Sequence, residues 1–177
     1  MSEPRETGNG RILCVTVALV GLALPARLPA ANPETIAVRV TFVAPIAISE
    51  ANALQFGSLD QNLADLESVT VAPDSAVTDS ADRVEGGPQA AASLTVTATP
   101  GQAITIHVDA IVSGAGYALT DFRCNYAAGI DAVCEGAGYS GTSVASGSLL
   151  VGATLTGDGT AVAGAADGSF DITVTYQ

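Results

Sequence analysis

Apolar and polar side chains alternate, with a period of two residues, along much of the chain. The clearest alternating runs are residues 36–42, 94–98, 104–108, 149–155 and 170–176. Alternation of this kind predicts β-strands with one face toward a core and the other toward solvent. Shorter strands are expected at residues 46–49, 54–57, 69–72 and 119–126.

Turn residues separate these runs. Thr-Pro-Gly-Gln at residues 99–102 predicts a type II turn and a hairpin, because proline fixes φ at the second position and glycine accepts a positive φ at the third. Glycine-rich stretches at 86–88, 136–141 and 157–159 predict further loops. Only residues 62–67 have helical character, over one or two turns. Short strands joined by turns predict an all-β, antiparallel sandwich.

The start of the chain has the pattern of an export signal. An apolar segment at residues 12–24 follows a basic residue and is followed by small residues. This order predicts a signal peptide over residues 1–31, with Ala26 and Ala30 as alternative cleavage positions to Ala31. Thirteen apolar residues are fewer than the roughly 20 that a membrane-spanning helix needs. We therefore expect a single exported domain of residues 32–177, which passes the periplasm and ends at the cell surface or outside the cell.

Removal of the signal peptide on export would leave two cysteines in the chain, Cys124 and Cys134. An even number of cysteines in an exported chain predicts a disulfide, and two free thiols are the alternative. The bond would close a loop of eleven residues, to which the chain-entropy model assigns about 3 kcal/mol. Two cysteines with no histidine nearby do not make a metal site.

The composition excludes one class of partner. The 177 residues include eighteen acidic and six basic side chains, for a net charge of −12, and all six basic residues are arginine. A nucleic-acid binder needs clustered basic residues to neutralise phosphates, so we expect no nucleic-acid partner. Tryptophan is absent, so a core of Val, Ile, Leu and Ala is expected.

Residues 73–92 combine acidic side chains with Ser, Ala, Thr and Gly. The carboxylates in this segment belong to Asp74, Asp79, Asp82 and Glu85. Calcium takes several carboxylate oxygens, but the spacing does not match a calcium-binding EF-hand loop. We interpret the segment as a solvated loop, with a cation site as the alternative.

The chain offers no starting point for a catalytic mechanism. His107 is the only histidine and lies on the polar face of a predicted strand, without a nucleophile motif nearby. The acidic residues are scattered rather than paired, and no glycine-rich phosphate loop precedes a helix. We expect no enzyme and no cofactor, with His107 at the surface; a secreted hydrolase is the remote alternative.

The end of the chain carries the most specific pattern. Phe170, Ile172, Val174 and Tyr176 alternate with polar residues, Tyr176 is penultimate, and Gly164 is fourteenth from the end. This ending resembles the C-terminal signature of chaperone–usher pilins. The resemblance implies an incomplete immunoglobulin-like (pilin-like) sandwich, whose last strand pairs with a periplasmic chaperone before a neighbour's N-terminal extension fills the groove. The alternative is an ordinary closing strand of a complete sandwich.

Most of the expected mature chain resembles a secreted bacterial family rich in Ala, Gly and Thr. That family is known only as a domain of unknown function, and it is similar to fimbrial and spore-coat-U-like subunits. The resemblance is carried by residues 54–57, 94–106 and 152–176. Residues 122–137 depart from it, because two cysteines staple an apparent insertion there. The resemblance implies a structural or adhesive role and names no ligand.

The first alternating run has two interpretations. Ile36, Val38, Val40 and Phe42 form a candidate donor strand that fills pockets in a neighbouring copy, or else the first strand of their own domain. We expect a fimbria-like structural subunit whose partners are other copies or related subunits, a periplasmic chaperone and an outer-membrane usher. The alternative function is a self-complete sandwich that binds a ligand or calcium as an adhesin.

Overall fold

The computed structural model describes residues 37 and 39–177. All the strands belong to the unit formed by residues 41–177. The described residues contain twelve β-strands and no helix. No helix long and apolar enough to cross a membrane is therefore found among the described residues. The predicted leader lies outside the described residues.

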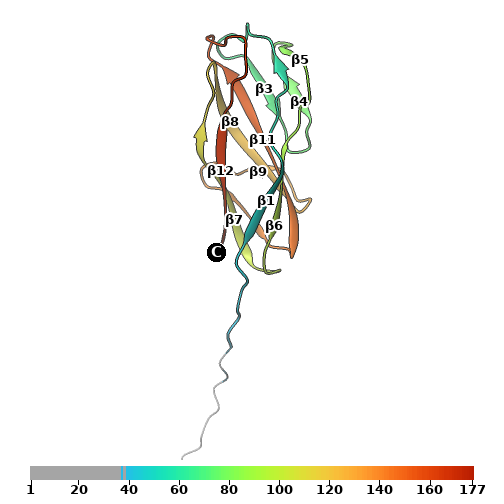
Figure 1. Cartoon of the computed structure of the whole chain (residues 1–177). Helices are drawn as coiled ribbons and strands as arrows, with labels where there is room; N and C mark the ends of the chain where they lie inside the picture. Colours follow the sequence, from blue (N-terminus) through green and yellow to red (C-terminus); the bar gives the residue numbers. More distant parts are fainter. Residues whose placement is uncertain (1–36, 38) are drawn as a thin grey trace, which may run out of the picture. The chain divides into compact units, whose positions relative to one another are not determined.

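The strands pair antiparallel throughout and form two sheets and a two-stranded ribbon (Figure 1). Their bounds, in chain order, are β1 Ala47–Asn52, β2 Ser58–Leu59, β3 Ser68–Val71, β4 Val77–Asp79, β5 Val84–Gly86, β6 Ala92–Thr97, β7 Ala103–Val112, β8 Tyr117–Tyr126, β9 Ala132–Val133, β10 Tyr139–Thr142, β11 Ser146–Gly157 and β12 Ser169–Tyr176. The predicted all-β, antiparallel sandwich is confirmed.

The large sheet is organised around β11. One edge of β11 pairs with β8, and the other edge pairs first with β6 and then with β3. Beyond these, β1 pairs with β6, β4 with β3 and β9 with β8. The change of partner occurs at Gly152, where a Cβ atom would overlap the carbonyl oxygen of Val71. Glycine is therefore needed at this position to let the two backbones approach.

The second sheet has three strands, with β7 between β10 and β12. The last strand, β12, follows β7 almost to the end of the chain, so that Asp171 lies opposite Asp109 and Tyr176 opposite Ile104. A bulge at Ala110, which has a φ of 48°, interrupts the pairing near the start of β12. Among the described residues, no strand pairs with the outer edge of β12.

Side chains from both sheets form one core. Its fully buried members include Val96, Ile104, Ile106, Phe122, Leu149 and Val151. The rings of Phe122 on β8 and Phe170 on β12 join the two sheets, with centroids 4.8 Å apart. The predicted disulfide is confirmed: Cys124 and Cys134 are bonded, both are fully buried, and they connect β8 to the residue that follows β9.

The predicted turn at residues 99–102 is present, but the predicted hairpin is wrong. Gly101 has a φ of 78°, as a type II turn requires. The strands on either side, β6 and β7, nevertheless belong to different sheets. The chain therefore crosses from one layer of the sandwich to the other at this turn.

Four other local predictions were also wrong. Residues 62–67 form turns rather than a helix, and residues 54–57 contain only a single bridge, from Gln55 to Ala90. In the run 36–42, the described residues form no strand. The expected loop at 73–92 includes the short strands β4 and β5, which pair with β3 and β2. The strands β4 and β5 depend on their pairing partners β3 and β2 more than on their local sequence pattern.

Ser143 holds the inter-sheet turn in place. Its hydroxyl accepts the N–H of Gln102 and contacts the carbonyl oxygens of Thr99 and Gln102, and the residue is 2% exposed. We predict that Ser143→Ala lowers the free energy of unfolding by about 1–3 kcal/mol, because it leaves buried polar partners unsatisfied. Denaturant unfolding measures this effect. The exposed Ser146→Ala is the control, and an equally small effect of both substitutions would contradict the prediction.

Candidate functional site

Several strands within the described residues have an unpaired edge, and two of them, β1 and β12, line a common groove. In the large sheet, β1 pairs only with β6, and in the three-stranded sheet, β12 pairs only with β7. A groove of about 430 Å³ lies between β1 and β12. Its walls include Ile48 and Glu50 from β1 and Phe170 and Ile172 from β12, and β6 contributes Leu94.

Alternate residues of β12 direct their backbone groups toward the unpaired edge. In an antiparallel pair, residues that exchange both hydrogen bonds alternate with residues that exchange none. The N–H of Gln177 donates to the carbonyl oxygen of Ala103 at 3.0 Å, which fixes this alternation along the strand. Thr173 and Thr175 therefore bond to β7, whereas the N–H and C=O groups of Ile172 and Val174 point toward the unpaired edge.

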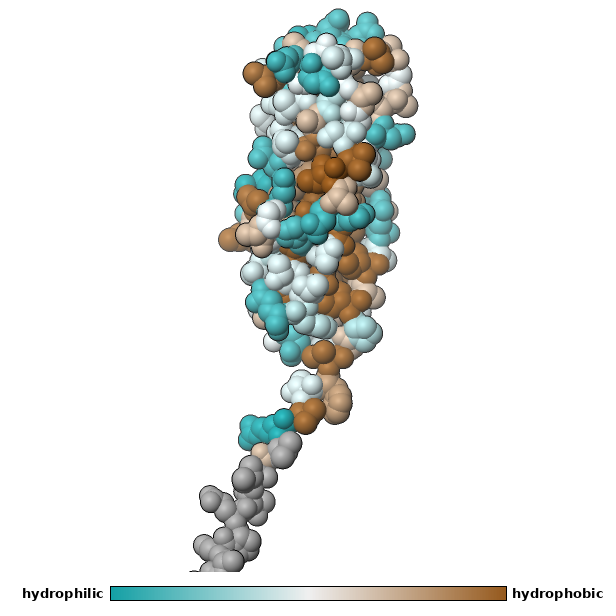
Figure 2. All heavy atoms as spheres, turned by 90° about the vertical axis from the view of Figure 1, so that its left-hand side faces the viewer, coloured by the Kyte–Doolittle hydropathy of each residue, from teal (hydrophilic) through white to brown (hydrophobic). Residues whose placement is uncertain are grey.

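The apolar face of β12 is only partly covered. Phe170, Ile172, Val174 and Tyr176 all face the core, and all four are half-buried. By contrast, the core-facing residues of the adjacent β7 are at most 2% exposed; they are Ile104, Ile106 and Val108. On the other wall of the groove, Ile48 is 38% exposed. Figure 2 shows apolar side chains reaching the surface between polar ones on one face of the molecule.

Hydrogen bonds anchor the end of β12. The hydroxyl of Tyr176 donates to the carbonyl oxygen of Ala44 at 2.9 Å and accepts the N–H of Thr99 at 2.8 Å. The N–H of Ala44 in turn donates to the Thr99 hydroxyl. These bonds connect the end of β12 to the segment that precedes β1, beyond the Ile172 end of the groove.

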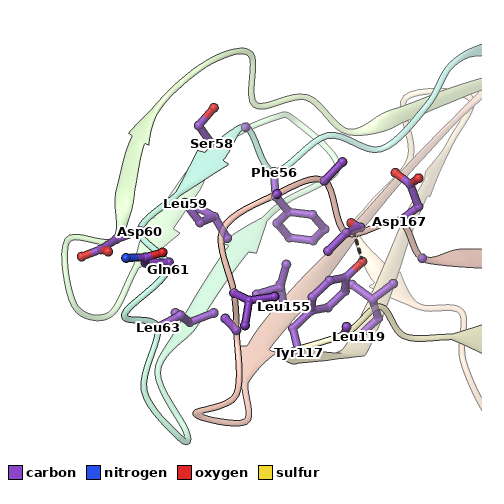
Figure 3. A pocket seen from close by; sticks show the side chains of 18 of the residues that line it. Phe56, Ser58, Leu59, Asp60, Gln61, Leu63, Tyr117, Leu119, Leu155 and Asp167 are labelled. Carbon is purple, nitrogen blue, oxygen red and sulfur yellow. Dashed lines mark hydrogen bonds between the residues drawn. The ribbon is translucent and has the colours of Figure 1, made fainter.

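A larger pocket continues the groove at the Phe170 end. It has a volume of about 640 Å³, and it shares Leu54 and Phe170 with the groove (Figure 3). The residues between β1 and β3 form one side, and the loop 161–168 forms another. Apolar side chains such as Phe56 line it, while the hydroxyl of Tyr117 donates to the carbonyl oxygen of Ala166 at 3.1 Å. Burial raises the pKa of this tyrosine.

Arg83 fixes the loop on one side of the pocket. Its guanidinium donates two hydrogen bonds to Glu67, at 2.8 and 2.9 Å, and a third to Asp60 at 3.3 Å. The bond from Arg83 lowers the pKa of Glu67, and the bond from the backbone N–H of Asn62 lowers that of Asp60. The positive charge of Arg83 is therefore satisfied inside its own domain.

The four acidic residues considered as a cation site do not form one cluster. Asp79 accepts the backbone N–H groups of Ala81 and Val84, and Asp74 accepts that of Ala76, as in turns that carboxylates stabilise. Neither Asp82 nor Glu85 joins them: the described residues contain no group of three or more Asp, Glu, His or Cys side chains placed to hold a metal.

The two predicted pairing elements have different outcomes. Phe170, Ile172, Val174 and Tyr176 do share the core-facing side of one strand, as predicted, but Gly164 lies outside that strand, in the loop that lines the pocket. In the candidate donor segment, Ile36 and Val38 lie outside the described residues. Val40 and Phe42 are 66% and 90% exposed and belong to no strand, so the role of this segment stays a prediction.

Sequence analysis missed the β1 side of the groove. Ile48 and Glu50 lie directly opposite Val96 and Leu94 on β6. All six residues of β1 are exposed, because the strand is at an edge and β12 does not cover it. The short apolar pattern of residues 46–49 predicted a strand but contained no signal that its outer edge would be unpaired.

Comparison with known proteins identified one family. A family model described as a domain of unknown function (DUF4402) matches residues 46–176, which include every strand of the domain. No curated protein and no solved structure matched the chain. The family description assigns no activity, so the geometry of the groove is the basis for a functional proposal.

The bonds of Tyr176 predict a measurable effect on stability. We expect Tyr176→Phe to lower the free energy of unfolding by about 1–3 kcal/mol, because the N–H of Thr99 and the C=O of Ala44 lose their partner. Denaturant unfolding provides the measurement. Tyr139→Phe is a matched control, since that tyrosine is also half-buried but has no such hydrogen bonds. A change no larger than that of the control would refute the role of the hydroxyl.

His107 is expected to titrate above the ordinary imidazole value of about 6.5. Its pKa is raised by the hydrogen bond to the carbonyl oxygen of Gly136 and by Asp109, whose carboxylate lies 2.8 Å from Nδ1. Because the folded-state pKa is raised, this contribution to stability is complete below pH 6.5 and is lost as the pH rises through the folded value. An NMR titration of the single histidine measures the pKa, and Asp109→Asn should lower it. An unshifted pKa in the wild-type chain would contradict this assignment.

Proposed function

The chain belongs to the DUF4402 family, and from this premise we propose that it is a structural subunit of a fimbria-like cell-surface filament or coat. Copies assemble by β-strand addition: a segment of one copy enters the groove of the next and pairs with β12. The apolar groove between two unpaired strand edges is the observation that carries this proposal.

An added strand would supply both things that β12 lacks: hydrogen-bond partners for its outer edge and a cover for its apolar face. Its backbone would pair with the N–H and C=O groups of Ile172 and Val174, and its apolar side chains would cover the half-buried face of β12. Proteins usually protect such edges with lysine, proline, bulges or very short strands. The eight residues of β12 contain neither lysine nor proline. The open edge is therefore interpreted as a binding element.

The segment that fits the groove is residues 36–42 of another copy. Its apolar residues alternate as an inserted strand requires, and the aromatic ring of Phe42 is almost fully exposed. In this proposal the part of the segment nearest its own domain lies at the Phe170 end. Its N-terminal part then points toward Tyr176, and the added strand runs antiparallel to β12.

Export and assembly factors complete the proposal. An open apolar groove would aggregate during transit, so a periplasmic chaperone would occupy it until an outer-membrane usher replaces the chaperone by the next subunit. In this proposal the domain is an immunoglobulin-like sandwich without its closing strand, similar to fimbrial and spore-coat-U-like subunits, and it has no catalytic role. It is exported through the periplasm to the cell surface.

A self-complete adhesin is the second candidate function. The observation that favours it is the pocket of about 640 Å³, whose size is in the range of small-ligand sites. In that case the domain would be a stable monomer, the groove would stay empty, and a ligand would bind beside Phe56 and Tyr117.

A synthetic peptide of residues 34–44 tests β-strand addition directly. We expect it to bind the dilute full-length chain and to raise its melting temperature, because a ligand that binds only the folded state stabilises it. The control peptide carries serine at positions 36, 38, 40 and 42. Failure of the native peptide to bind, or equal binding of both peptides, would argue against the proposed function.

Substitutions in β12 should separate the two faces of this strand. Ile172→Ser and Val174→Ser remove apolar contacts on the core-facing side of β12, so we expect each to weaken peptide binding at least about tenfold. Thr173→Ser, on the outer face, is the matched control and should leave binding unchanged. Fluorescence anisotropy of a labelled peptide measures the affinities, and an equal response of all three variants would exclude a strand in the groove.

A further inference from the structure

We propose that Arg39 of one copy pairs with Asp171 of the next copy and that this ion pair sets the register of assembly. This inference rests on the proposed function, because it assumes that residues 36–42 add to β12. It goes further by identifying the residues that choose one alignment among several that the apolar pattern allows.

The apolar pattern alone permits alignments that differ by two residues. A shift by one residue would turn every apolar side chain outward, whereas a shift by two keeps them all inward. In one antiparallel alignment, Val40 lies opposite Phe170 and Val38 opposite Ile172, which places Arg39 opposite Asp171. Shifting by two residues moves Phe42 opposite Phe170 and places Arg39 opposite Thr173.

The surroundings of Asp171 favour a positive charge on its unpaired side. On its paired side it lies directly opposite Asp109, and like charges at such positions are unfavourable. Of these two carboxylates, only that of Asp109 contacts the imidazole of His107. Glu50, on the other wall of the groove, adds a second carboxylate. Asp171 exchanges its hydrogen bonds with β7, so toward an added strand it occupies a non-hydrogen-bonded position, where facing side chains are closest.

Arg39 is the cation available for this position. The expected mature chain has no lysine and only two other arginines, Arg83 and Arg123. Arg83 is engaged by Glu67 and Asp60, and Arg123 donates to the carbonyl oxygen of Asp131. None of the ion pairs within residues 37 and 39–177 includes Arg39.

The two ends of the groove fit the same alignment. At the other end, Ile36 lies opposite Val174, so the apolar run of the segment ends before Tyr176, whose hydroxyl bonds to Ala44 and Thr99. At the Phe170 end, Phe42 extends past Phe170 to Gly168, which lines both the groove and the larger pocket. The exposed aromatic ring of Phe42 would then fill apolar space beside Leu54 and Phe170.

Disulfide trapping between two full-length chains tests the register while both charged residues stay in place. One chain carries Ala37→Cys and the other carries Thr173→Cys, which face each other in the proposed alignment. The competing pair is Ala37→Cys with Thr175→Cys, which faces in the alignment shifted by two residues. Every chain also carries Cys14→Ser, and tags of different length identify the mixed dimer on a non-reducing gel.

We expect the 37–173 dimer to exceed the 37–175 dimer about fivefold, as one favourable cross-strand charge pair allows. Arg39→Glu should abolish this preference, Arg39→Lys should keep it, and Arg39→Glu combined with Asp171→Arg should restore it. A dominant 37–175 dimer, or a preference that Arg39→Glu leaves unchanged, would overturn the charge-set register and leave β-strand addition standing. Absence of both mixed dimers would overturn β-strand addition itself.

Discussion

The unpaired edge of β12 is the constraint on which the rest of the account depends. A strand in the interior of a sheet shares its backbone hydrogen bonds with two neighbours, but β12 has only β7. The residues whose backbone groups point away from β7 are those whose side chains face the core. Ile172 and Val174 therefore present unpaired backbone and half-covered apolar side chains on the same side, and one added strand would satisfy both.

The remainder of the domain makes the two ends of the groove different. Tyr176 bonds to Ala44 and Thr99 beyond one end of the groove, while the pocket beside Phe56 continues the other end. The Arg83 ion pairs and the Cys124–Cys134 disulfide hold other parts of the sandwich rigid. An incoming segment thus meets a preformed groove, which limits the conformational freedom lost on binding.

Local sequence pattern predicted the strands well where the alternation is long. Three of the predicted strands lie within observed ones: residues 104–108 in β7, 149–155 in β11 and 170–176 in β12. The disulfide was predicted from the even number of cysteines in the expected mature chain. The pairing partners of the strands could not be predicted, because period-two alternation shows which face of a strand is buried and not which strand lies beside it. The turn at Gly101 illustrates this limit: its conformation was predicted correctly, yet it joins two sheets rather than two paired strands. The pairing of the last strand with another chain was expected from the resemblance to pilins and not from the alternation. The opposite wall of the groove, formed by Ile48 and Glu50 of β1, was not foreseen.

Amide hydrogen exchange along β12 tests the central claim most directly. In the dilute chain, the account predicts fast exchange at Ile172 and Val174 and slow exchange at Thr173 and Thr175, since only the latter two donate to β7. Raising the concentration, or adding the segment 34–44, should slow exchange at Ile172 and Val174 as an added strand pairs with them. Slow exchange at all four residues in the dilute monomer would contradict the account, because the edge of β12 would then already be paired.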